Sequence, residues 1–584
     1  MIVVLARPQR RRGLALLVAL AVLVAVWLAW CAATILSGER LASAGLAAAR
    51  QARSGVHFSQ LDTPAAGASS ELDRAARDVS AAHGRLSAFY LDPLRVVPWV
   101  GTQLASARDL TGAAATVLGA GSSDLATARR LLATHPATPA ERAALVESLA
   151  GVLGGFDRQL HGVRLGPSHG LLHALAAKRA TVAAELSQVT AGVDRVSGAM
   201  SALADLVSGS RTYLLIAANN AEMRAGSGMA LQLGSFSAAG GKLALGPLRP
   251  AVSLVERSSP LSAPGYLGAL WGFEHPTLDF RDLFLSPQFP ANAALAAAMW
   301  QQRTGQHVDG VLVVDDQAVA DLIGATGPVS AGGVTLTAAG ADRYLLQTQY
   351  RGIRNGDPAN LQRRERLGLL AGAALHRLSA PSTSLPAVAT ALERAAAGRH
   401  ILAWSPDPAI EADWMRAGVG GAVTGNSLLL SLLNQGANKL DPYQSVTAHL
   451  ATHVAGAATV VTVTVTDRNL TPPGLSGYAA GGAPGLPPAR VYTGAIALDF
   501  PARAGRASVL GRTRYEASGP DGGTDVLAVP VVVPDRGSVT VTFSFTLSGA
   551  HGELTVDPSA RLPPTTWTAS GRTWTDAVQH HYSW

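Results

Sequence analysis

The chain of 584 residues contains a single cysteine, Cys31, which lies inside its longest uncharged segment. A disulfide joins two cysteines, so no intrachain disulfide stabilises the protein. The shortage also excludes metal sites built from clusters of cysteines. Stability must therefore come from buried hydrophobic cores, for which the length is ample.

Lysine is scarce as well: Lys178, Lys242 and Lys439 are the only three, against 44 arginines. Together with the heavy use of alanine and glycine, this bias indicates a G+C-rich bacterial genome. The net charge is +7, but four positive charges are arginines of the first 12 residues, which leaves +3 for the remainder. No arginine-rich stripe with interleaved aromatic residues occurs, so nucleic acid is not an expected partner.

The catalytic motifs with the clearest mechanisms are missing: the sequence has no HExxH, no Walker loop and no GxGxxG. Gly166–Gly170 (GPSHG) has the spacing of a nucleophile elbow, which requires a strand before it and a helix after it. Helical patterns flank it on both sides, so a chance match in a loop is the simpler interpretation. His449 and His453 are spaced to share a strand face and bind a metal, and two exposed histidines are the simpler alternative.

Charge is absent from residues 13–36, a run of 24 residues that reads GLALLVALAVLVAVWLAWCAATIL. About 20 apolar residues are enough to cross the hydrocarbon layer as a helix. Arginines in the preceding tail, Arg7 and Arg10–Arg12, favour a cytoplasmic N-terminus. We therefore expect a cytoplasmic tail over 1–12, a transmembrane helix over 13–36, and a bacterial cell-membrane protein whose bulk is extracytoplasmic.

Two other interpretations of this run are weaker. A cleaved signal peptide has an apolar region of about 7–15 residues, which is shorter, and no small-x-small cleavage site follows here. Cys31 has the position of a lipoprotein acceptor, but Trp30 stands before it, where a small residue is required. An uncleaved anchor is the better prediction.

The remainder predicts a multidomain α+β protein. Residues 37–208 have apolar residues at three- and four-residue spacing, which favours a helical membrane-proximal bundle or stalk. A coiled-coil surface for a partner is the alternative. The segment Asp92–Gly101 (DPLRVVPWVG) breaks the pattern with two prolines. The predicted helices are Ser70–Tyr90, Leu104–Leu118, Pro139–Leu153 and Ala176–Ser208.

Residues 209–400 alternate strands with helices, which indicates an α/β domain. Tyr213–Ala217 and Val308–Val314 read as buried strands, and Gln317–Ala325 and Arg363–Leu378 as helices. We expect a connecting segment over 401–440. Residues 441–584 alternate β-branched and polar residues between Gly/Pro-rich turns, as in Ala457–Asp467, and predict a β-sandwich with a C-terminal tail.

Two polar clusters in the α/β part are the candidate binding residues. One follows the first strand, and ligands of open α/β sheets bind beyond the carboxyl ends of strands. The other lies in YRGIRNGDPANLQRRER, where arginines suit phosphate oxygens and an aspartate suits a divalent cation that bridges phosphates. A surface loop with paired charges is the alternative for the second cluster. The candidates are Asn219, Asn220, Glu222, Arg224, Arg351, Arg354, Asp357, Arg363 and Arg364.

The stretch YLLIAANNAEMRAGSG, within Tyr213–Leu245, resembles the hallmark of an uncharacterised bacterial membrane-protein family, domain of unknown function four-thousand-and-twelve. DPLRVVPWVG resembles that family's proximal signature. So do the segments Phe280–Pro290, Val308–Asp315 and Asn434–Tyr443.

The part from Val308 to Arg366 is similar to the LytR-CpsA-Psr phosphotransferases, with the best match at Arg351, Asp357, Arg363 and Arg364. The resemblance implies a polyprenyl-phosphate-linked glycan as partner and a magnesium ion held with the pyrophosphate. The sequence departs from those enzymes at Asn219-Asn220, where they have aspartate, and at Ala225-Gly226. Amides are weaker magnesium ligands than carboxylates, so magnesium should matter less here.

We therefore expect a single-pass cell-envelope protein that binds or transfers a lipid-linked, phosphate-bearing glycopolymer. Whether it is an enzyme stays open. The alternative is a non-catalytic scaffold or assembly factor in envelope or polysaccharide export. The first hypothesis predicts that Arg224, Arg351 and Arg363 face one cavity, lined by Asn220 and Asp357.

Overall fold

The computed structural model describes residues 9–55, 66–134, 136–380 and 382–584. The chain forms two compact units. The helical unit comprises residues 1–135 and 148–194, and the mixed unit comprises residues 136–147 and 195–584. The boundary is crossed at three places, and two of them, at 147/148 and 194/195, fall inside helices.

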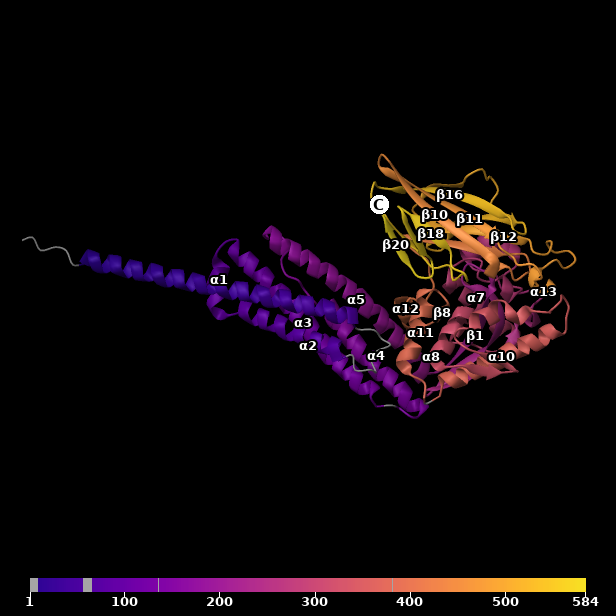
Figure 1. Ribbon diagram of the computed structural model, residues 1–584, viewed down its shortest axis with the longest axis horizontal. Helices are drawn as coiled ribbons and strands as arrows, with labels where there is room; N and C mark the ends of the chain where they lie inside the picture. The colour runs from indigo at the N-terminus through magenta and orange to yellow at the C-terminus, as the bar shows by residue number, and fades with distance from the viewer. Residues whose placement is uncertain (1–8, 56–65, 135, 381) are drawn as a thin grey trace, which may run out of the picture. The chain divides into compact units, whose positions relative to one another are not determined.

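Long helices make up the helical unit (Figure 1). α1 and α2 run antiparallel, and small residues of α1 let them approach closely: Gly38 contacts Leu86, and Gly45 leaves no room for a side chain against Val79. The helices predicted for residues 37–208 are therefore present: three are longer than predicted, and the first begins and ends four residues earlier. The elements are α1 (Gln9–Gly55), α2 (Ala66–Leu86), the 3₁₀ helix η2 (Phe89–Val96), α3 (Val100–Leu132), α4 (Pro139–His161) and α5 (His173–Ser208).

α1 contains Val22–Gln51, which among the described residues is the one helix long and apolar enough to cross a membrane. A signal sequence near the N-terminus or a core helix of a soluble protein can also meet this criterion of length and hydropathy. Core helices are buried, however, whereas Val26 and Trp30 of α1 are exposed.

The mixed unit begins with a six-stranded sheet of order β3-β2-β1-β5-β8, with β4 on the edge of β2. β1 and β5 form its one parallel pair. β1 continues to Met223, beyond its predicted end, so Asn219 and Asn220 lie within the strand rather than after it. The strands are β1 (Ser210–Met223), β2 (Gly228–Ala239), β3 (Lys242–Leu245), β4 (Arg249–Pro250), β5 (Gly310–Val314) and β8 (Ile401–Trp404).

Helices follow the strands of this sheet, and their starts carry recognisable caps. The side chains of Asp315, Ser384 and Asp407 accept hydrogen bonds from backbone N–H groups at the starts of α8, α11 and α12. The helices are α6 (Gly265–Trp271), α7 (Phe289–Thr304), α8 (Asp316–Thr326), α9 (Ala341–Leu346), α10 (Ala359–Leu378), α11 (Leu385–Ala397) and α12 (Pro408–Arg416). The remaining short elements are η3 (Ala251–Leu254), η4 (Gly272–Glu274), η5 (Phe280–Asp282), η6 (Thr348–Tyr350) and the hairpin β6 (Val329–Ala331) and β7 (Val334–Leu336).

The C-terminal third is rich in strands, as predicted, and forms two further six-stranded sheets of orders β13-β16-β11-β10-β18-β19 and β14-β15-β12-β9-β17-β20. We call them the C-terminal sheet pair. Its elements are β9 (Ser427–Asn434), η7 (Asp441–Tyr443), β10 (Gln444–Ala455), β11 (Ala458–Asn469), α13 (Gly477–Ala480), β12 (Tyr492–Pro501), β13 (Gly505–Val509), β14 (Ala517–Asp521), β15 (Thr524–Val533), β16 (Ser538–Ser548), β17 (Glu553–Val556), β18 (Thr566–Ala569), β19 (Arg572–Thr575) and β20 (His580–Ser583).

The sheet pair shares a core with the first sheet. In β12, Leu498 points between the two C-terminal sheets, whereas its neighbour Ala497 faces a cluster that includes Trp271 of α6, Phe289 of α7 and Ile216 of β1. Because successive side chains of a strand point to opposite faces, a strand buried on both faces reads as one apolar run. The first sheet, the helices α6 and α7 and the sheet pair therefore form one continuous body.

The segment 401–440, expected to be a connection, contains β8, α12 and β9. All eight residues of β9, SLLLSLLN, are buried. This run lacks the polar alternation that predicts strands in residues 441–584, because both of its faces are covered.

Candidate functional site

β1 and β5 run parallel and pair up to Ala217 and Val314, where β5 ends, and β1 continues beyond this point to Met223. Asp315 and Asp316 follow β5 directly. Asp315 Oδ1 accepts hydrogen bonds from the backbone N–H groups of Gln317 and Ala318 and so begins α8. This is the edge at which α/β sheets usually bind ligands, and it is the candidate site.

Asn220 of β1 is fully buried and bonds only within the chain. Its Nδ2 donates to Asp315 Oδ2 at 2.9 Å and to the carbonyl oxygen of Ala560 at 2.8 Å. Its Oδ1 accepts from the backbone N–H of Asp316 at 3.0 Å, and Asp316 Oδ2 accepts from the backbone N–H of Asn220 at 3.0 Å. An amide fits here because a third carboxylate would be repelled by its two acidic neighbours.

His400, just before β8, completes this group. Its Nδ1 lies 2.7 Å from Asp315 Oδ2, and both side chains are buried. Burial alone would lower the pKa of His400, but the Asp315 carboxylate outweighs it, so the pKa lies above its ordinary value. Burial, followed by the charge of Asp315, raises the pKa of Asp316 to about 8. Asp315 thus serves as the charged partner of His400, while Asp316 is disposed to stay protonated.

Asn219 belongs to a neighbouring aromatic group. Tyr350 donates its hydroxyl hydrogen to Asn219 Oδ1 at 3.2 Å. The guanidinium of Arg363 lies over the rings of Tyr350 and Tyr478, and its Nε donates to Asn360 Oδ1 at 2.9 Å. Among the described residues, Arg363 Nη2 and Asn219 Nδ2 are buried without a hydrogen-bond partner.

Glu222 forms a buried ion pair with Lys439, whose ammonium group also lies over the ring of Tyr478. Although burial opposes the change, Lys439 and Arg363 together lower the pKa of Tyr478. The pairing stabilises both groups, because either charge buried alone would lower the stability of the folded protein.

Arg224 follows β1 and directs its guanidinium at the backbone. Its Nη1 donates to the carbonyl oxygen of Asn434 at 2.6 Å, and its Nε donates to that of Arg281 at 3.1 Å. Arg224 therefore joins the end of β1 to two other segments of the chain.

The remaining candidates lie at and before the start of α10. Arg351 and Arg354 are exposed. Asp357 Oδ1 accepts a hydrogen bond from the backbone N–H of Ala359 at 2.8 Å, and Arg364 is part-buried. The nine candidates thus divide into a buried set (Asn219, Asn220, Glu222, Arg224 and Arg363) and a loop set (Arg351, Arg354, Asp357 and Arg364).

Three residues central to the buried set were absent from the sequence-based candidates: Asp315, Asp316 and Lys439. After the first strand the chain has Asn219-Asn220, where the similar enzymes have aspartate. The acidic pair stands instead after the parallel strand β5, at Asp315-Asp316. The aspartates that directly follow the clearest buried strand were the signal for this.

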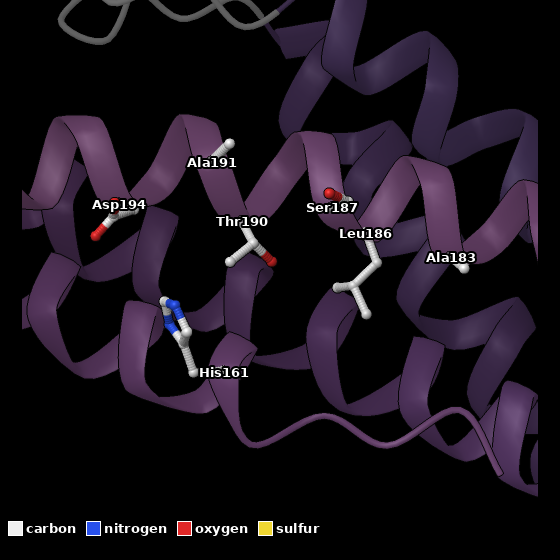
Figure 2. A pocket seen from close by; sticks show the side chains of 7 residues that line it. All are labelled: His161, Ala183, Leu186, Ser187, Thr190, Ala191 and Asp194. Carbon is white, nitrogen blue, oxygen red and sulfur yellow. The ribbon is translucent and has the colours of Figure 1, made fainter. Parts of the chain in front are cut away.

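Among the described residues no group of three or more histidine, cysteine or acidic side chains is arranged to hold a metal ion. A pocket in the helical unit lies between the end of α4 and one face of α5 (Figure 2). His161 and Asp194 are its titratable lining residues, beside Leu186 and small side chains. It lacks the convergent arginines or backbone N–H groups that a phosphate requires.

Comparisons place one part of this architecture in a known family. No curated protein and no solved structure matches the chain. Residues 208–350 match the model of a family described as "Protein of unknown function (DUF4012)". This segment runs from the end of α5 through β1, β2, β5 and α8 to Tyr350, and so contains most of the buried site. Over residues 208–350 the chain is therefore similar to this uncharacterised family.

Proposed function

We propose that this protein is a single-pass cell-envelope protein that acts as a non-catalytic scaffold or assembly factor. Its N-terminus would lie in the cytoplasm, and the chain after the apolar run, including the mixed unit, would lie outside. The apolar helix α1 and the arginines before it support this orientation. A reporter active only in the cytoplasm, fused after Trp584, should be silent, and a strong signal would contradict the orientation.

The observation that carries the scaffold role is that three polar side chains of the buried site bond to other parts of the chain. General acid–base catalysis requires a side chain within hydrogen-bonding distance of substrate. Asn220 and Asp315 instead bond to one another and to Ala560 and His400. Arg224 bonds to the backbone of Asn434. Such a network fixes the first sheet against the C-terminal sheet pair and gives a rigid body suited to binding partners.

Complementation of a deletion strain separates scaffold from enzyme. The variants Asp316→Asn and His400→Gln keep nearly the same shape but cannot act as acid and base in the same way. If the protein is a scaffold, both variants should restore the envelope phenotype of the deletion strain. Immunoblots should show that each variant reaches the wild-type amount of protein in the membrane. Loss of function at equal protein level would favour catalysis at this site.

A second candidate function, binding of a lipid-linked, phosphate-bearing glycopolymer, is favoured by the loop set. Arg351 and Arg354 are exposed, and no hydrogen bond or ion pair occupies their side chains among the described residues. Guanidinium groups of this kind are suited to bidentate contacts with phosphate. The similarity of this loop to the LytR-CpsA-Psr phosphotransferases motivates the choice of ligand.

Titration of the full chain in nanodiscs with a polyprenyl phosphate tests this function. Arg351→Ala should weaken binding by ~1.5–3 kcal/mol, the range for a hydrogen bond to a charged group. Arg377→Ala, an equal loss of charge at the other end of α10, is the control and should bind as wild type does. Adding a chelator should change little. If wild type does not bind, or both variants bind equally, the scaffold function alone remains.

A further inference from the structure

The connection between α2 and α3 carries large apolar side chains that no other described part of the chain covers. Phe89 is 82% exposed, Val96 84% and Trp99 57%. Apolar residues scattered singly over a surface are ordinary, but a contiguous exposed group marks an interaction site. We call residues 89–99 the apolar loop.

The other side of the apolar loop binds the N-terminal helix. Leu91 and Leu94 form a buried cluster with Cys31 of α1. Trp27 Nε1 donates to the carbonyl oxygen of Tyr90 at 3.0 Å. The loop is therefore held against α1 on its inner face, while Phe89, Val96 and Trp99 remain outside.

These contacts fall within the apolar run of α1 and not beyond it. Trp27 and Cys31 precede the first charges that follow the run, Glu39 and Arg40. Twenty helical residues span about 30 Å, so a span that begins at Gly13 leaves the hydrocarbon near Ala32. Trp27 then lies about 7 Å inside that boundary, which is the depth of about 5–10 Å typical of interfacial segments.

The shape of the apolar loop is fixed. Trp99 has a φ of 70°, a left-handed conformation that is strained for a bulky residue. A side chain at Gly101 would clash with the carbonyl oxygen of Arg95. Strain of this kind persists only where the surrounding structure enforces it. The fold therefore holds Trp99 in its outward position.

The charges of the loop are also suited to an interface. Arg108 Nη1 bonds to Asp92 Oδ1 at 3.0 Å, and Arg95 lies 3.9 Å from the same oxygen. Arg95 is exposed and long enough to reach lipid phosphates while its stem stays in apolar surroundings. Tryptophan and tyrosine, here Trp99 and Tyr90, are the residues enriched at membrane–water boundaries.

We propose that the apolar loop inserts into the outer leaflet of the membrane beside α1, as a second membrane contact that sets the depth of the helical unit. The proposal rests on the proposed anchor role of α1. Its ligand is the lipid bilayer: acyl chains for Phe89, Val96 and Trp99, and head groups for Arg95.

Site-directed fluorescence on the full chain in phosphatidylcholine–phosphatidylglycerol nanodiscs tests the proposal. In a Cys31→Ser background, single cysteines at Phe89→Cys and Val96→Cys are labelled with a polarity-sensitive dye. Val26→Cys, exposed on α1, reports on the anchor, and Ala126→Cys, exposed near the far end of α3, reports on water. Quenchers are nitroxides on lipid chains and aqueous iodide.

The emission maximum of dyes at positions 89 and 96 should lie at a shorter wavelength than that of a dye in water. The lipid nitroxide should quench most of their fluorescence, and iodide should quench little of it. Ala126→Cys should behave oppositely. If Val26→Cys is lipid-quenched while Val96→Cys is quenched only by iodide, the anchor stands and the insertion fails. If Val26→Cys is itself quenched by iodide, the anchor proposal fails. Protection of Val96→Cys from both quenchers would mean that a protein, or a second copy of this chain, covers the loop, which also overturns the proposal.

Discussion

Replacing Asn220 by alanine is the sharpest test of how the two parts of the mixed unit are joined. The side chain bonds to Asp315 Oδ2, to the carbonyl oxygen of Ala560 and to the backbone N–H of Asp316. Alanine removes all three bonds. Asp315 Oδ2 keeps its contact with His400, so two buried backbone groups are left without partners.

A buried group that loses its hydrogen-bond partner costs about 1–3 kcal/mol. Two such groups, partly relieved by water entering the space, should lower the free energy of unfolding by about 3–4 kcal/mol. The mixed unit has about 400 residues, and its unfolding entropy of about 2.1 cal/mol/K per residue then gives a melting temperature lower by about 4–5 °C.

Differential scanning calorimetry of the purified chain in detergent measures the shift. Asn355→Ala removes an exposed asparagine from the same unit and should melt as wild type does. If Asn220→Ala melts within about a degree of the control, the network does not join the sheets and the reasoning is refuted.

The variant Asn220→Asp adds a pH signature. Its carboxylate would face Asp315 and Asp316, and repulsion between like charges should make it less stable than Asn220→Ala at about pH 8. Protonation restores a donor, so the deficit should shrink towards about pH 5. A deficit that does not depend on pH would show that charge repulsion is not its cause.

Two further predictions concern neighbouring buried groups. The pKa of Asp316 is about 8 in the folded protein against an ordinary 3.8, so folding takes up a proton between these pH values. The free energy of unfolding of the wild type therefore falls as the pH rises from about 4 to about 8. Asp316→Asn cannot ionise at position 316, so its melting temperature relative to wild type should rise between about pH 4 and pH 8. Calorimetry that shows a constant difference over this range would contradict the raised pKa of Asp316. Lys439→Met leaves Glu222 buried without its partner and should cost about 3–5 kcal/mol in denaturant unfolding. Adding Glu222→Leu should recover most of that loss, and a double variant as unstable as Lys439→Met would show that the ion pair is not responsible.

Local patterns in the sequence predicted much of the fold because the physical causes are local. Three- and four-residue spacing of apolar residues indicated the helices that became α2 to α5. Alternation of valine and threonine predicted β11, whose valines Val461, Val463 and Val465 are buried. β9 was not found, since burial on both faces erases the alternation.

The candidate site was predicted only in part. Asn219 and Asn220 were identified as polar residues at the end of a buried strand, and they lie in β1 just beyond its pairing with β5. Their partners were not identified, because Asp315 is 95 residues from Asn220 and Ala560 is 340 residues from it. Such neighbours are set by the parallel pairing of β1 with β5 and by the shared core with the sheet pair.

The arginines show the same division between sequence and tertiary structure. The sequence determined that Arg224 and Arg351 carry permanent positive charge with donors suited to phosphate or to any other oxygen. The fold decided which oxygen each one meets. Arg224 is buried and bonds to the carbonyl oxygen of Asn434, 210 residues away, whereas Arg351 stays at the surface. Both residues are simply arginines in the sequence. Their different roles depend on the chain segments that fold around each guanidinium.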